Sequence, residues 1–174
     1  MKRYAASMLL ILWTISLCAC SFPQAAGNDP VTFYYPWADL NAAMELDPGC
    51  TAITAEERDI SGRRDSLSYL LSLYFRGPLD SSLNSPFPAG TSLLNLQQED
   101  STLIITLSTA FAQLKGIDLT IACNCLAQTC FELSDVQEVL IQTSQDDAET
   151  AVSVSIGRNN SLLTDTIPQT TPTE

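Results

Sequence analysis

Residues 67–78 read LSYLLSLYFRGP, and this stretch does more than any other to decide the fold. Its apolar residues recur at helical spacing and form one stripe: Leu67, Leu70, Leu71, Tyr74 and Phe75. Ser61 or Asp65 is the expected cap of this helix. Gly77 and Pro78 end it, because glycine accepts a left-handed backbone and proline cannot continue a helix. The stretch therefore predicts an amphipathic helix that lies on a core.

Strand-like runs lie on both sides of this helix. A β-rich run ended by Pro36 opens the folded part, and alternating apolar and polar residues follow the helix. The predicted strands cover residues 31–35, 56–60, 92–97, 102–108, 136–143 and 151–156. Leu94 and Leu96 are expected to face the core from the third strand, since polar neighbours alternate with them. The turn at residues 98–101 predicts that strands three and four form a hairpin.

A second helix is predicted within residues 110–133, begun or broken near Gly116. Its buried stripe consists of Leu119, Ala122, Cys123, Leu126, Cys130 and Leu133. Ile121 and Cys125 lie off this stripe, so the helix is apolar on more than one face. Residues 39–54 remain ambiguous, apart from a turn at Pro48 and Gly49.

The first residues have the pattern of an export signal. Met-Lys-Arg precedes a short apolar run from Met8 to Leu17, which is shorter than the roughly 20 residues of a membrane span. The end of that run, LCAC at residues 17–20, resembles the bacterial lipobox and implies a diacylglycerol thioether on Cys20. We therefore expect a lipoprotein signal peptide at 1–19, a flexible spacer at 20–30, a domain at 31–157 and a disordered tail at 158–174.

Charge and composition exclude several functions. The 174 residues carry a formal charge of -12, and the chain without Lys2 and Arg3 carries -14. Such an excess of acid repels phosphate backbones, so we expect no nucleic-acid partner. Histidine is absent, which removes the commonest general base and the commonest zinc ligand. We expect neither an enzyme nor a bound cofactor.

The order of these segments resembles a known family. Five segments are similar to the GerMN domain of sporulation and spore-germination proteins. They are the first strand, the motif ERDI at residues 57–60, the Leu-rich helix with its Gly-Pro stop, residues 83–91 (LNSPFPAGT) and residues 103–111 (LIITLSTAF). The resemblance covers residues 31–143. It implies an α+β fold like that of ring-building modules, with a small mixed sheet of four to six strands and two helices packed on one face. It also implies action through protein contacts or envelope binding.

The cysteines and charged clusters leave several interpretations. Cys50, Cys123, Cys125 and Cys130 are read as small buried apolar residues, with a disulfide from Cys50 to a helix cysteine as one alternative and a metal site as another. The metal site is disfavoured because the three helix thiols do not converge on one side. The acidic pair Glu56-Glu57 and the acids near residue 146 are read as solvated charges.

Arginines give the candidate interaction residues. Arg58, Arg63 and Arg64 gather half of the basic residues that follow the leader, and they are expected to meet an acidic wall polymer or partner, or to form an exposed helix start. The expected partners are membrane lipid through acylated Cys20, and envelope proteins or peptidoglycan. We interpret the chain as a scaffolding or assembly lipoprotein of sporulation or germination; the alternative is a ligand-binding or wall-polymer-binding envelope lipoprotein. The last hairpin, residues 136–156, is a candidate for strand addition.

Overall fold

The computed structural model describes residues 30–60, 65–144 and 151–160. Its elements follow the order β1 (Val31–Pro36), α2 (Leu40–Leu46), β2 (Ile53–Arg58), α3 (Leu67–Tyr74), β3 (Leu93–Glu99), β4 (Thr102–Leu107), η2 (Thr109–Gln113), α4 (Gly116–Leu133), β5 (Glu138–Thr143), β6 (Ser153–Gly157) and η3 (Arg158–Asn160). The fold is α+β, as predicted.

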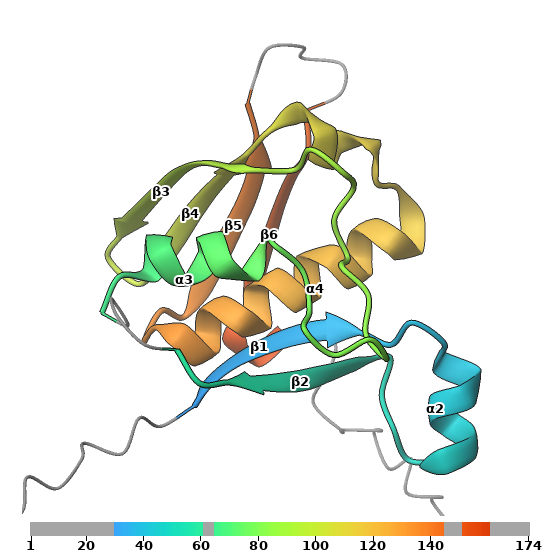
Figure 1. Ribbon diagram of the computed structural model, residues 1–174. Helices are drawn as coiled ribbons and strands as arrows, with labels where there is room; N and C mark the ends of the chain where they lie inside the picture. Colours follow the sequence, from blue (N-terminus) through green and yellow to red (C-terminus); the bar gives the residue numbers. More distant parts are fainter. Residues whose placement is uncertain (1–29, 61–64, 145–150, 161–174) are drawn as a thin grey trace, which may run out of the picture.

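Two sheets share this part of the chain. Strands β3, β4, β5 and β6 form one mixed sheet in that order, in which only the β4–β5 pair is parallel. Strands β1 and β2 form a separate antiparallel ribbon. Figure 1 shows α3 and α4 on one side of the four-stranded sheet, with the ribbon beyond α4. The expected mixed sheet with two helices on one face is confirmed, and the ribbon adds a further layer.

Helix α4 lies between the two sheets, which explains why it is apolar around most of its circumference. Thr129 accepts a hydrogen bond from the backbone N–H of Tyr34 on β1, at 3.0 Å. Cys125, one turn earlier on the same face, is also fully buried. Cys123 and Leu126 belong to the core that the sheet covers. The helix begins at Gly116 after a separate 3-10 turn.

Alternating side chains on β4 and β5 show which face of the four-stranded sheet lies on the core. Leu103, Ile105 and Leu107 on β4 are buried, as are Val139 and Ile141 on the parallel neighbour β5. Figure 1 shows these two strands in the middle of the sheet, with β3 and β6 at its edges. The alternation of apolar and polar residues expected of the strands after the helix is confirmed on β4 and β5.

The expectation for Leu94 is wrong. Leu94 is 55% exposed, while Leu93 and Leu96 pack against the core. The register shifts between Leu93 and Asn95, so Leu94 is the extra residue of a β-bulge. Because a bulge breaks the alternation of side chains, a pattern read at a strict period of two assigns the wrong residue inward.

The helix ends also differ in part from expectation. Ser66, rather than Ser61 or Asp65, caps α3, and its hydroxyl accepts from the Tyr69 N–H at 3.3 Å. Ser61 lies outside the described residues. At the other end Gly77 has φ +91°, the left-handed conformation that the Gly-Pro stop predicts. Within the ambiguous stretch, Asp39 caps the short helix α2 through the N–H groups of Asn41 and Ala42.

Candidate functional site

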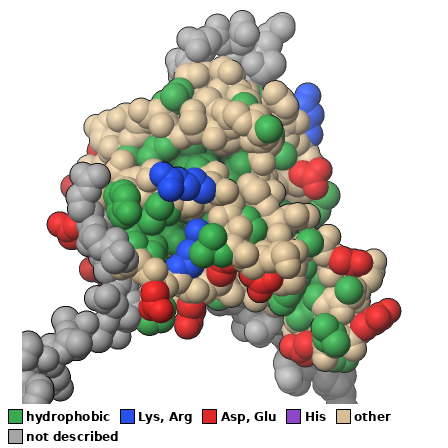
Figure 2. Space-filling view, viewed as in Figure 1, with side chains coloured by type: hydrophobic (Ala, Val, Ile, Leu, Met, Phe, Trp, Pro, Cys, Tyr) green, Lys and Arg blue, Asp and Glu red, His purple; other side chains and the backbone are tan. Residues whose placement is uncertain are grey.

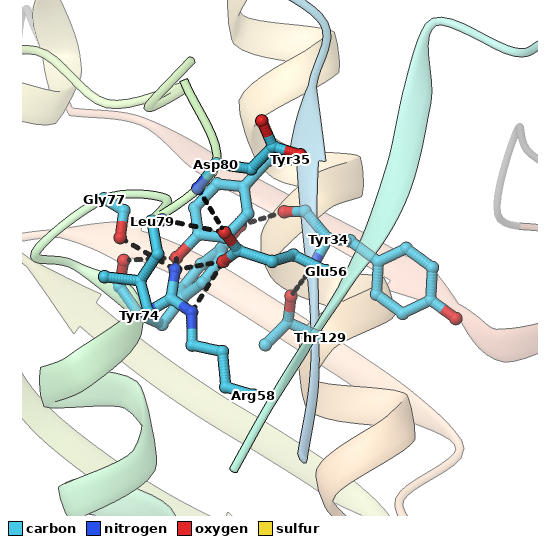
Figure 3. A network of polar contacts seen from close by, with 9 residues as sticks. All are labelled: Tyr34, Tyr35, Glu56, Arg58, Tyr74, Gly77, Leu79, Asp80 and Thr129. Carbon is cyan, nitrogen blue, oxygen red and sulfur yellow. Dashed lines mark hydrogen bonds and ion pairs between the residues drawn. The ribbon is translucent and has the colours of Figure 1, made fainter. Parts of the chain in front are cut away.

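Arg58 is the centre of a buried polar network that ties the ribbon to the end of α3 (Figure 3). Its side chain is 9% exposed and forms an ion pair with Glu56, with Nε 2.6 Å from Oε2. Its Nη2 donates to the Tyr35 hydroxyl at 3.0 Å and to the Gly77 carbonyl at 2.8 Å. The guanidinium also lies 4.9 Å from the centre of the Phe33 ring. These contacts direct Arg58 into the fold rather than toward solvent.

Glu56 completes the network and corrects an expectation. Its side chain is 8% exposed and not solvated, whereas its neighbour Glu57 is exposed. The second carboxylate oxygen accepts from the backbone N–H groups of Leu79 and Asp80, at 2.7 and 2.8 Å. Residues two apart in a strand share a face, so Glu56 and Arg58 turn inward together. The E-x-R spacing within a strand was the available signal for this pair.

Tyrosines join the network to β1 and α3. The Tyr35 hydroxyl donates to the Tyr74 carbonyl at 2.9 Å, and the Tyr74 hydroxyl donates to the Tyr34 carbonyl at 2.8 Å. Burial raises the pKa of both phenols, most of all for the fully buried Tyr74. Each phenol therefore stays neutral and acts as a fixed donor. The network holds segments together and leaves none of these hydroxyls free for acid–base chemistry.

A groove of about 500 Å³ runs beside this network, between β2 and α3. Arg58 lies in its wall, Arg76 is exposed beside it, and apolar lining comes from Leu73, Pro78 and Leu79. Figure 2 shows Lys and Arg side chains set among hydrophobic ones on this face. Exposed Glu57 and Asp59 line the same groove, so its charge is mixed.

The structure describes only some of the predicted site residues. Cys20, Arg63 and Arg64 lie outside the described residues. Arg58 is committed to the internal network, and the interaction proposed for the three arginines stays a prediction.

The helix cysteines are buried apolar residues, as expected. Cys123, Cys125 and Cys130 are at most 2% exposed, and Cys50 is half-buried. Burial raises the pKa of Cys123 to about 12 and that of the other two helix thiols still further. All four are free thiols in the structure, so the alternative of a disulfide from Cys50 is not realised there. Within the described ranges, no group of three or more potential ligands could hold a metal ion.

Sequence reasoning missed Arg158, which was assigned to the tail. Its guanidinium donates to the carbonyls of Phe131 and Ser134, both at 2.9 Å, and to that of Val136 at 3.1 Å. It also lies 4.9 Å from the centre of the Phe131 ring. These carbonyls belong to the end of α4 and the segment after it, where a cation is favourable. The fold therefore continues to at least Asn160, beyond the predicted boundary at 157.

Strand β6 is an open edge of the sheet. The backbone N–H of Thr143 donates to the Val152 carbonyl, and the backbone N–H of Arg158 donates to the Gln137 carbonyl. These two hydrogen bonds show which opposite residues of β5 and β6 are hydrogen-bonded pairs. Because bonded and non-bonded pairs alternate, the N–H and C=O groups of Ser153, Ser155 and Gly157 point away from β5. Within the described part of the chain these backbone groups have no partner. A groove of about 390 Å³ lies beside this strand.

The comparison that decides the family is one of sequence. The model of the family described as Germane, sporulation and spore germination, matches residues 32–168. The chain belongs to this family. Its domain is thus a sporulation and germination domain of the kind the GerMN resemblance indicated. No curated protein is similar enough to count as a match.

Solved structures show distant likeness to this Germane domain. Tandem GerMN domains of the sporulation protein GerM from Bacillus subtilis align over 66% of this chain and 38% of that one, with 16% identity and a TM-score of 0.45. The chain thus spans less than half of that structure. The first GerMN domain of the same protein aligns over 74% and 98%, with 18% identity and a TM-score of 0.49.

A third structure comes from Clostridium perfringens and is described as a lipoprotein. It aligns over 75% of this chain and 89% of its own, with 16% identity and a TM-score of 0.43. Among the helices of the described ranges, none is both long and apolar enough to cross a bilayer.

Proposed function

We propose that this Germane-family chain is an acylated extracytoplasmic lipoprotein that binds other envelope proteins during sporulation or germination and is not an enzyme. The leader supports the anchor, because LCAC at residues 17–20 has the pattern in which Cys20 is acylated. The family description supports the process. The buried network supports a non-catalytic role, since its charged and phenolic groups are bonded within the fold.

The open edge of β6 carries the proposed mode of binding. An edge strand offers backbone donors and acceptors to any extended segment, and natural edges are commonly protected by charge or proline. Residues 151–157 read AVSVSIG and contain neither. Ser153 and Ser155 are exposed, which supports access of a partner strand to this edge. Within the predicted hairpin at 136–156, β6 is thus the strand that we propose to receive the partner.

A single proline tests this mode. The Ser153 N–H points away from β5, so Ser153→Pro removes an outward donor and no ladder hydrogen bond. Full-length Ser153→Pro and Ser153→Ala proteins, used as baits in membranes of sporulating cells, are compared by quantitative mass spectrometry. We expect proteins captured by the Ala variant to be lost with Pro. Equal capture by both variants would refute binding through this edge.

Two further measurements test the remaining parts of the proposal. Mass spectrometry of the mature N-terminus should find a diacylglycerol group on Cys20, and Cys20→Ser should release the protein from the membrane. Recovery of a chain with residues 1–19 intact contradicts the anchor. Co-sedimentation with purified peptidoglycan that is equal for the Ser153→Pro and Ser153→Ala proteins favours the wall-polymer alternative.

A further inference from the structure

We infer that the groove beside β6 selects the added strand: it takes an extended, uncharged segment with apolar side chains at alternate positions. The inference rests on the proposed strand addition and adds to it a specificity. The open edge alone accepts any extended backbone, because the ladder hydrogen bonds do not depend on sequence. What distinguishes partners is the surface that the side chains of the added strand meet.

The groove is built from β6, α4 and the ends of the neighbouring elements. Val154, Ile156 and Gly157 line it from the strand, and Leu119, Thr120 and Cys123 line it from the helix. Its volume of about 390 Å³ is in the range of pockets that hold small ligands or several side chains. Leu119 and Val154 both pack against the hydrophobic core, so the floor of the groove continues the core to the surface.

The geometry of a strand decides how this groove is used. Side chains of a strand alternate between its two faces, so every second residue of an added strand turns toward α4. There it meets the aliphatic side chain of half-buried Leu119, whereas Cys123, which also lines the groove, is only 2% exposed. The other residues turn toward the outer face of the sheet, beside Ser153 and Ser155. An alternating pattern of apolar and hydroxyl residues matches both surfaces.

Charge gives a second constraint on the partner. Glu138 is the charged residue among those that line the groove, and its carboxylate accepts from the Ser155 hydroxyl on the outer face. Among the described residues that line the groove on the side facing α4, the buried Cys123 thiol is the only ionisable group. A charged side chain placed there would lose its hydration without gaining an ion pair. The groove therefore rejects charge at the alternate positions.

The test uses two heptapeptides, one alternating Thr and Val and one in which Ser replaces each Val. Each is titrated into full-length protein in detergent micelles, and the amide signals of Ser153, Ser155 and Gly157 are followed by NMR. Burial of one or more Val side chains predicts at least about tenfold tighter binding of the Thr/Val peptide. Equal affinities for the two peptides overturn the inference.

Variants of α4 locate the effect. Thr120→Tyr fills the groove, so we expect it to weaken binding of the Thr/Val peptide about tenfold and to bring it to the level of the Thr/Ser peptide. Glu132→Tyr introduces the same side chain at an exposed position of α4 outside the groove and should leave the difference between the peptides intact. If Thr120→Tyr leaves the preference for Val unchanged in a protein with native amide dispersion, the groove does not select the strand.

Two outcomes separate this inference from the proposed function. If Ser153→Pro weakens the binding of both peptides, and the Thr/Val and Thr/Ser peptides bind with equal affinity, strand addition is supported and selection by the groove is refuted. If Ser153→Pro changes neither, strand addition itself fails. A chain that ends at Asn160 tests whether residues 161–174 occupy the groove instead of a partner. Markedly tighter peptide binding by that chain than by the full-length protein would show that they do.

Discussion

The Tyr35 hydroxyl donates a hydrogen bond of 2.9 Å to the backbone carbonyl of Tyr74, and the centroids of the two rings lie 4.9 Å apart. This pair joins the first strand to the last turn of α3, which are 39 residues apart in the sequence. The same hydroxyl accepts from Arg58. The buried network thus depends on a phenol that both donates and accepts.

Removing that hydroxyl should destabilise the domain. Tyr35→Phe leaves one Arg58 N–H without its partner inside the core and removes one of two hydrogen bonds to the Tyr74 carbonyl, which also accepts from the Gly77 N–H at 3.0 Å. We expect a cost of about 1–3 kcal/mol. Tyr34→Phe is the matched control, since in Figure 3 the Tyr34 phenol points away from the network. Urea unfolding should show a shift only for Tyr35→Phe. Similar midpoints for both variants would mean that water replaces the lost contacts.

The ion pair predicts a larger effect. Arg58→Ala leaves the Glu56 carboxylate buried without its cation, and breaking a buried pair costs about 3–5 kcal/mol. Arg76→Ala removes the same side chain from an exposed position nearby and should change stability by no more than about 0.5 kcal/mol. Denaturant midpoints measure both. A small loss for Arg58→Ala would place the guanidinium in solvent.

The turn after α3 allows a test of backbone strain at Gly77. Gly77 has φ +91°, and a Cβ built there meets nothing closer than the Ser85 Cβ at 3.8 Å. Gly77→Ala should therefore cost about 1–2 kcal/mol through backbone strain rather than through a clash. Gly49, which has no positive φ, provides the control. Thermal unfolding should separate the two variants by several degrees; coincident melting curves would contradict the strain.

The buried thiols predict a loss of stability at alkaline pH. Their pKa is raised in the folded state, to about 12 for Cys123, against about 8.5 in an unfolded chain. Their contribution is complete below pH about 8.5 and is lost as the pH rises toward the folded pKa, by about 1.4 kcal/mol per pH unit for each thiol. Urea midpoints measured from pH 7 to 10 should decline accordingly.

Alkylation provides an independent check on these thiols. At pH 8 in the native state, half-buried Cys50 should react with iodoacetamide, whereas the three helix cysteines should react only after unfolding. In the proposed mature chain, which lacks Cys18 and carries the lipid on the Cys20 sulfur, Cys50→Ser should remove the fast phase. Rapid native labelling of Cys123, Cys125 or Cys130 would show that α4 opens readily.

The sequence by itself determined the local elements and most of the core. The Leu-rich stripe fixed α3, alternation fixed the inward faces of β4 and β5, and apolar residues around α4 indicated a helix covered on more than one side. These patterns are local, because helix and strand periodicity depend on residues close in the chain. The family motifs and the candidate anchor at Cys20 were equally readable from short stretches.

Only the tertiary structure decided how distant residues meet. It turned Glu56 and Arg58 inward, brought Tyr74 and Gly77 to them, and placed Arg158 on the end of α4. It also moved Leu94 outward through a bulge. The E-x-R spacing places Glu56 and Arg58 on one face of β2, but whether that face is buried depends on contacts with segments far apart in the sequence, which no local pattern encodes. The open edge of β6 arises in the same way, from the order of strands in the sheet.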